Sequence, residues 1–67
     1  MSTVEAFRRA ERGETISAAI YAHFAKQFAD DEAAHRLFVQ LEAEEVQHAS
    51  RVRLLASRYR ADKRLLA

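Results

Sequence analysis

Two residues of types that bind metal ions lie three positions apart in the segment Glu45-Val-Gln-His48. Both fall on a stripe whose steps alternate between three and four, the spacing that keeps one helix face against a partner. The stripe comprises Ala34, Phe38, Leu41, Glu45, His48, Val52, Leu55 and Tyr59. A carboxylate and an imidazole on such a face are expected to be buried, which is costly unless something compensates for them. A metal ion compensates for both, so the pair predicts a metal site.

The first half of the chain predicts a helix with a matching stripe. Ser2 or Thr3 is a suitable N-cap, and nothing stops the helix before about Ala29. Gly13 lies inside it at a cost of about 1 kcal/mol relative to alanine, which a long helix tolerates. The stripe of this helix comprises Phe7, Glu11, Glu14, Ala18, Tyr21, Ala25 and Phe28.

A second helix is expected after Asp30 and Asp31, whose side-chain oxygens suit an N-cap. Glu32 adds negative charge to its first turn, where the helix dipole favours it. Nothing ends this helix before Leu65, and no third segment follows. The chain, residues 1–67, is therefore expected to be a single all-α domain, a two-helix antiparallel hairpin.

Folding the chain back at Asp30 brings a third potential ligand to the pair. Glu14 lies sixteen residues before Asp30 and Glu45 fifteen after it, so both lie about 23 Å from the turn at about 1.5 Å per residue. His48 follows one turn farther along. Two apolar layers are expected to flank the group, Tyr21 with Phe38 towards the turn and Phe7 with Val52 away from it. Glu14, Glu45 and His48 are thus the predicted metal ligands.

A two-helix hairpin leaves half of each apolar stripe in water, so a second copy is expected to complete a four-helix bundle. A two-fold axis then gives four carboxylates and two imidazoles facing inward. This ligand set occurs in ferritin-like di-iron and di-manganese proteins. Carboxylate and imidazole suit iron or manganese, whereas zinc usually takes four ligands. Four carboxylates also balance the charge of two divalent ions.

The runs from Glu14 to Ala25 and from Glu42 to Ala49 resemble one helical hairpin of the rubrerythrins, which carry Glu, a Tyr seven residues on, and Glu-x-x-His-Ala after a turn. The two-helix format is similar to that of encapsulated ferritins, whose iron site spans a subunit interface. The resemblance covers about residues 7–56. It implies a ferritin-like homodimer, or a larger even-numbered oligomer, with two iron ions per dimer and ferroxidase activity in iron storage, and an encapsulating shell protein as a possible partner.

The resemblance also implies roles for single residues. Glu14 and His48 would be terminal ligands, and Glu45 would bridge the two ions. Tyr21 would be either a core residue or a catalytic one that hydrogen-bonds a metal-bound carboxylate or donates an electron. The chain departs from the family in having Ser17 where one rubrerythrin hairpin has a further Glu, in lacking cysteine, and in a C-terminal segment, 61–67, unlike a shell-docking peptide.

The composition and net charge of the chain bear on its compartment and argue against two other classes of function. The chain has no cysteine, which favours a reducing compartment, and we expect a cytoplasmic protein, inside a protein nanocompartment if the resemblance extends that far. A net charge of +1 argues against a dedicated nucleic-acid binder. No apolar run is long enough to span a membrane.

Two other functions stay open. The chain is a plain helical oligomerisation module if the polar seam residues only set pairing specificity. It is an oxygen or peroxide sensor if the metals react only once per site.

The residues outside the stripe are expected to have minor roles. Ile16, Ile20 and Phe24 either widen the bundle core or support higher assembly. The basic segment 51–64 is expected to be a solvated tail. Five further His and Glu residues are expected to contact neighbours or solvent: Glu11, His23, His35, Glu42 and Glu44. For the three glutamates among them, the alternative role is to attract metal ions towards the site.

Overall fold

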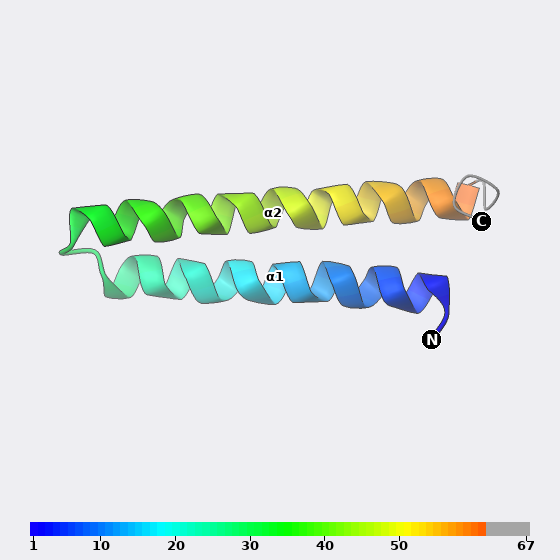
Figure 1. Cartoon of the computed structure of the whole chain (residues 1–67), viewed down its shortest axis with the longest axis horizontal. Coiled ribbons are helices and arrows are strands. Elements are labelled where there is room, and N and C mark those ends of the chain that lie inside the picture. The colour runs from blue at the N-terminus through cyan, green and yellow to red at the C-terminus, as the bar shows by residue number, and fades with distance from the viewer. Residues whose placement is uncertain (62–67) are drawn as a thin grey trace.

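The computed structural model describes residues 1–61 and has two helices, α1 (Thr3–Gln27) and α2 (Glu32–Ala61). They lie side by side and antiparallel in a rod of 50 × 18 × 12 Å (Figure 1). The predicted all-α, two-helix hairpin is confirmed, and residues 1–61 contain no strand. Neither helix, as far as it is described, combines the length and apolar character needed to cross a membrane.

Both helices begin at capping residues that the sequence indicates. The Ser2 hydroxyl accepts a hydrogen bond from the Glu5 backbone N–H at 3.1 Å. A carboxylate oxygen of Asp31 likewise accepts from the Ala34 N–H at 3.1 Å. Each cap satisfies one of the N–H groups that a helix leaves without a partner at its start. Of the two aspartates at the turn, Asp31 is therefore the one that caps α2.

Helix α1 ends at Gln27, two residues before the expected Ala29, because the chain tightens into a turn. The Ala29 N–H bonds to the Lys26 carbonyl and the Asp31 N–H to the Phe28 carbonyl, both three residues back. The ring of His35 donates its Nδ1–H to the Ala25 carbonyl at 2.7 Å, which satisfies an acceptor at the end of α1. The expected C-terminal end of the second helix at Leu65 and the end of the basic tail lie outside the described residues.

The buried core of the hairpin is made of four alanines: Ala18, Ala25, Ala49 and Ala56. The predicted stripe of α1 is correct from Phe7 to Ala25, where every member is buried or half-buried. On α2 the predicted stripe is correct at six of its eight positions, which are half-buried: Ala34, Phe38, Leu41, Glu45, Val52 and Tyr59. The expected burial of His48 is wrong for the single chain. Ala49 is 4% exposed, whereas the His48 side chain is 46% exposed.

The same displacement recurs seven residues later on α2. Ala56 is 7% exposed, and Leu55, which was expected in the seam, is 42% exposed. The seam between the helices therefore runs through Ala49 and Ala56, whose small side chains allow α1 to approach closely. His48 and Leu55 lie along one edge of this seam, one position away from its centre.

Aromatic rings flank the middle of the rod on both sides, as expected, and Tyr59 joins one of the two layers. Tyr21 stacks on Phe38 with ring centroids 6.4 Å apart, which confirms the layer towards the turn. Phe7 lies against Tyr59 with ring centroids 6.0 Å apart, and Val52, the expected partner of Phe7, is half-buried. Helical side chains tilt towards the N-terminus of their own helix, so those of α1 tilt away from the turn and those of α2 towards it. This tilt offsets Phe7 from its contact on α2.

Candidate metal centre

The three predicted metal ligands meet midway along the hairpin. The Nδ1 atom of His48 lies 3.4 Å from Oε2 of Glu14 and 3.4 Å from Oε1 of Glu45. One ligand atom from each residue lies within 4.8 Å of the other two. Glu45 and His48 are neighbours because they are one turn apart on α2, and Glu14 reaches them from α1. The antiparallel pairing of the helices thus assembles the group.

The two carboxylates are more enclosed than the imidazole. The side chains of Glu45 and Glu14 are 20% and 30% exposed, compared with 46% for His48. The Oε2 atom of Glu14 is buried and has no hydrogen-bond partner within residues 1–61. The His48 Nδ1 atom, 3.4 Å away, is a neighbour of this oxygen but is too far for a well-formed hydrogen bond. A buried carboxylate oxygen without a hydrogen bond is a suitable ligand for a cation.

The protonation of Glu45 reflects the same crowding. The pKa of the Glu45 carboxyl is raised, first because it shares a hydrogen bond with Glu14, then by partial burial and by repulsion from the Glu14 charge. His48 opposes the rise through its charge and its hydrogen bond. The proximity of two carboxylates that raises this pKa also favours a bound cation, because a cation would offset their mutual repulsion.

The residues present fit a metal ion by distance and by donor type. An ion with bonds of about 2.0–2.2 Å to nitrogen and oxygen holds adjacent ligand atoms roughly 3–3.5 Å apart. The separations of 3.4 Å from His48 to each glutamate agree with this spacing. Three ligands leave several positions of a six-coordinate ion open to water or to further ligands.

The other residues that the sequence singled out lie around the centre and outside it. The Tyr21 ring packs on Phe38, and none of the side-chain hydrogen bonds formed by residues 1–61 involves its hydroxyl. The structure thus supports its core role and does not bring it into the ligand group. Glu44 accepts a hydrogen bond from Gln40 on its own helix. His23 lies beside Phe24, away from the ligands.

Arg53 is a residue near the centre that the sequence reasoning missed. Its guanidinium lies 3.2 Å from the Glu11 carboxylate on α1 and also donates to Ser50. The pair therefore occupies one edge of the seam, next to the ligands, and neutralises Glu11. The only sequence signal was that Arg53 lies about one helical turn from the level of Glu11, at twenty-three residues from Asp30 compared with nineteen for Glu11.

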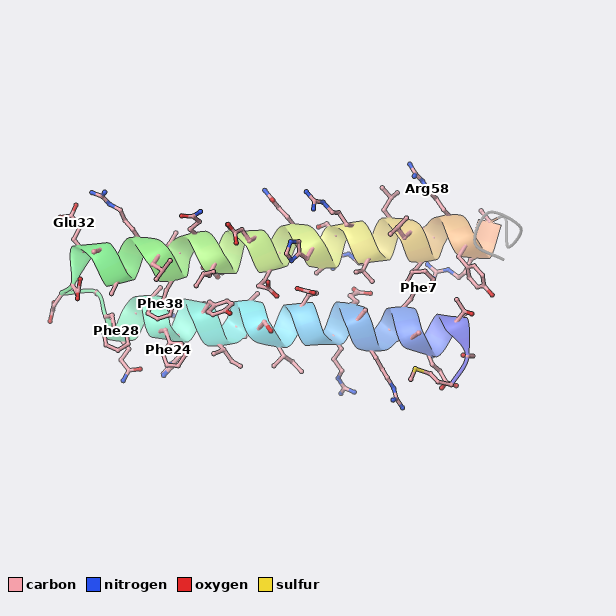
Figure 2. The ribbon with its side chains drawn as sticks, in the orientation of Figure 1. Phe7, Phe24, Phe28, Glu32, Phe38 and Arg58 are labelled. Carbon is pink, nitrogen blue, oxygen red and sulfur yellow. The ribbon has the colours of Figure 1, made fainter. Side chains whose placement is uncertain are left out.

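The opposite edge of the seam carries His48 and is apolar. At about 100° of rotation per residue, this edge of α1 holds Ser17, Ile20, Phe24 and Phe28, with no charged residue among them. On α2 the same edge holds Leu37, Leu41, His48 and Leu55. We call this surface the His48 face. Figure 2 shows Phe24, Phe28 and Phe38 gathered near the turn, at one end of the hairpin.

Comparisons with protein-family models, with curated proteins and with solved structures found no match. What the centre does must therefore be argued from the positions of Glu14, Glu45 and His48 and from the surface around them.

Proposed function

We propose that this chain binds metal ions as half of a two-metal carboxylate centre, which a second copy completes, and that the centre oxidises ferrous iron. The observation that carries the proposal is the convergence of Glu14, Glu45 and His48, from two helices, within 4.8 Å of one another. The buried Oε2 of Glu14, which has no hydrogen-bond partner within residues 1–61, supports it, because a cation bound there would compensate for the burial of this oxygen.

The surface around His48 supports the second copy. Several large apolar side chains of the His48 face are 42–53% exposed: Ile20, Phe28, Leu37 and Leu55. The accessible surface of 5258 Å² exceeds the roughly 4300 Å² typical of a compact monomer of 7.7 kDa. The excess is similar to the roughly 800 Å² that one partner buries in a standard interface. A second hairpin on this face would cover the apolar side chains and the open side of the site together.

Pairing around a two-fold axis would give the centre four carboxylates and two imidazoles, with four negative charges for two divalent ions. Hard carboxylate oxygens with imidazole favour iron or manganese over softer metals. Two ferrous ions give one electron each. Together with two protons, these electrons reduce one dioxygen to hydrogen peroxide, or one hydrogen peroxide to two waters. These protons would come from water, which reaches the group on the side of His48, whose side chain is 46% exposed.

Iron oxidation by matched variants tests the proposal. We expect Glu14→Gln, Glu45→Gln and His48→Ala each to lower the initial rate of ferrous iron oxidation at least about a hundredfold while the helical circular dichroism is retained. Glu5→Gln and His23→Ala make the same chemical changes at exposed positions away from the site, and should leave the rate unchanged. Rates in all three site variants equal to those of the controls would refute the site.

A helical oligomerisation module is the second candidate function, because exposed apolar side chains are abundant and the single hairpin buries only four alanines within residues 1–61. In that case Glu14, Glu45 and His48 would only restrict which partner fits. The module predicts a melting temperature that neither metal nor chelator changes, whereas the metal centre predicts a rise with ferrous or manganous ions. A metal-based sensor would give a single oxidation per site and no turnover with excess ferrous iron.

A further inference from the structure

Charge is separated along the rod to a degree that the overall net charge conceals. The metal group divides residues 1–61 into an end with the turn (14–47) and an end with the termini (1–13 and 48–61). The terminal end has seven arginines and two glutamates among its side chains, a net charge of +5. The turn end has seven acids against Lys26 and Arg36, a net charge of −5. Each hairpin is therefore strongly dipolar over its 50 Å length.

Only two kinds of two-fold axis bring two His48 faces together. An axis along the rod puts both turns at the same end, with α1 of one copy against α2 of the other. An axis across the rod puts the turns at opposite ends, with each helix against its own copy. An axis along the rod keeps the ligands of both chains at the same level. An axis across the rod does so when it passes through the ligand group, which lies midway along the hairpin. The ligands alone therefore do not decide the orientation.

We propose that the second copy packs with its turn against the termini of the first, around an axis across the rod at the level of the ligands. This inference rests on the proposed function, which requires the second copy. When metal ions neutralise Glu14 and Glu45, the turn end keeps five acids against two basic residues, a net charge of −3. In this orientation each +5 end then lies against a −3 end, whereas the other orientation sets like charges together at both ends.

Individual side chains at the edge of the His48 face agree with the crossed orientation. Glu44 lies four residues before His48 and Arg51 three residues after it, both on the same edge of α2. When α2 packs antiparallel on its copy around His48, Arg51 of one copy comes level with Glu44 of the other. Leu41 and Leu55, seven residues on either side of His48, come level in the same way. The pattern on α2 is thus self-complementary.

Distance measurement between spin labels tests the orientation, because the chain has no cysteine and a single one can be introduced. Ala29→Cys places a label at the turn, fifteen residues from the level of Glu14. In the proposed orientation the two labels lie about 45 Å apart, at about 1.5 Å per residue. In the other they lie within about 20 Å, since packed helices are only 8–10 Å apart. Gln47→Cys, at the level of the site, is the control and gives a distance below about 30 Å in either case.

The outcomes are distinguishable. A distance near 45 Å for Ala29→Cys supports the inference. A short distance overturns it and leaves the shared metal site standing. No dipolar coupling for either label, together with a monomer mass, overturns both the inference and the proposed function.

Charge exchange gives an independent test. We expect Arg51→Glu and Glu44→Arg each to weaken dimerisation about three- to thirty-fold at low salt, since each disturbs two symmetry-related pairs. The double variant should recover most of the loss, because each new glutamate faces a new arginine. Arg12→Glu lies away from the His48 face and changes the net charge by the same amount as Arg51→Glu. It should weaken dimerisation less than Arg51→Glu does. Additive losses in the double variant would contradict the proposed orientation.

Discussion

Replacing Glu14 with glutamine separates a metal-binding role of this residue from a structural one, because the two roles predict effects of opposite sign. The substitution preserves shape and removes one charge. In the metal-free protein it also replaces the unpartnered Oε2 atom, or the atom beside it, with an amide that can donate to Glu45. We therefore expect Glu14→Gln to stabilise the metal-free protein and to weaken metal binding.

The magnitudes follow from the geometry. One charge at about 2.1 Å from a divalent ion, at the screening of water, is worth about 4 kcal/mol, or roughly a thousandfold in affinity. Screening of this order is appropriate because the Glu14 side chain is 30% exposed. In the metal-free state the new hydrogen bond contributes about 1 kcal/mol, which raises the melting temperature by about 4–8 °C in a domain of this size.

Thermal unfolding at pH 7, with chelator and with a series of ferrous or manganous concentrations, measures both effects. At a metal concentration a hundredfold above the dissociation constant, the wild-type protein should gain about 2.7 kcal/mol. Glu14→Gln should have a higher melting temperature than the wild type in chelator, and its melting temperature should not rise at that metal concentration. Glu5→Gln is the matched control on the same helix and should follow the wild type. A Glu14→Gln variant that is less stable without metal, and responds to metal as the wild type does, would refute this reasoning.

The other predictions concern caps, packing and pH. Ser2→Ala removes the hydroxyl that accepts the Glu5 N–H and should cost about 1 kcal/mol in chemical denaturation, with no loss of metal binding; an unchanged midpoint would contradict the capping role. Phe38→Ala removes the ring that contacts three aromatic residues of α1 and the turn, and should cost about 2 kcal/mol or more; a loss no larger than that of Ser2→Ala would show that this cluster contributes little. The pKa of Glu45 is raised in the folded state, so the protonated carboxyl stabilises the metal-free protein. This contribution is fully present below the ordinary pKa of 4.5 and is lost as the pH rises through the raised pKa. In chelator, the melting temperature of the wild type minus that of Glu45→Gln should therefore decrease as the pH rises above 4.5 through the raised pKa, and a difference that stays constant would contradict this prediction.

Much of the hairpin could be predicted because its signals are local. The helix starts follow from Ser2 and Asp31, whose side chains cap the nearest N–H groups. The level of Glu14 with Glu45 follows from a constant rise per residue once the turn is placed. These two rules were sufficient to bring together the three ligands.

The errors arose where helix packing, rather than a local signal, decides the outcome. A spacing of three and four permits two adjacent stripes on α2, and apolar character favoured the one through His48 and Leu55. In the hairpin Ala49 and Ala56 are buried and His48 and Leu55 are exposed, although the other six members of the predicted stripe are half-buried. Counting levels by Cα position also neglected the tilt of side chains, which brings Phe7 against Tyr59 as well.

The displacement of His48 to the edge of the seam has a functional consequence. An imidazole at the seam centre would be enclosed by its own hairpin. At the edge it lies on an apolar face, where a second copy would reach it. The proposed dimer therefore follows more directly from the observed position of His48 than from the expected one.

The most direct test of the central claim is native mass spectrometry of the protein loaded with ferrous iron without oxygen. We predict a complex of two chains with two metal ions, replaced by metal-free chains when Glu45→Gln and His48→Ala are combined. A single chain that carries no metal at any ferrous concentration would contradict the account.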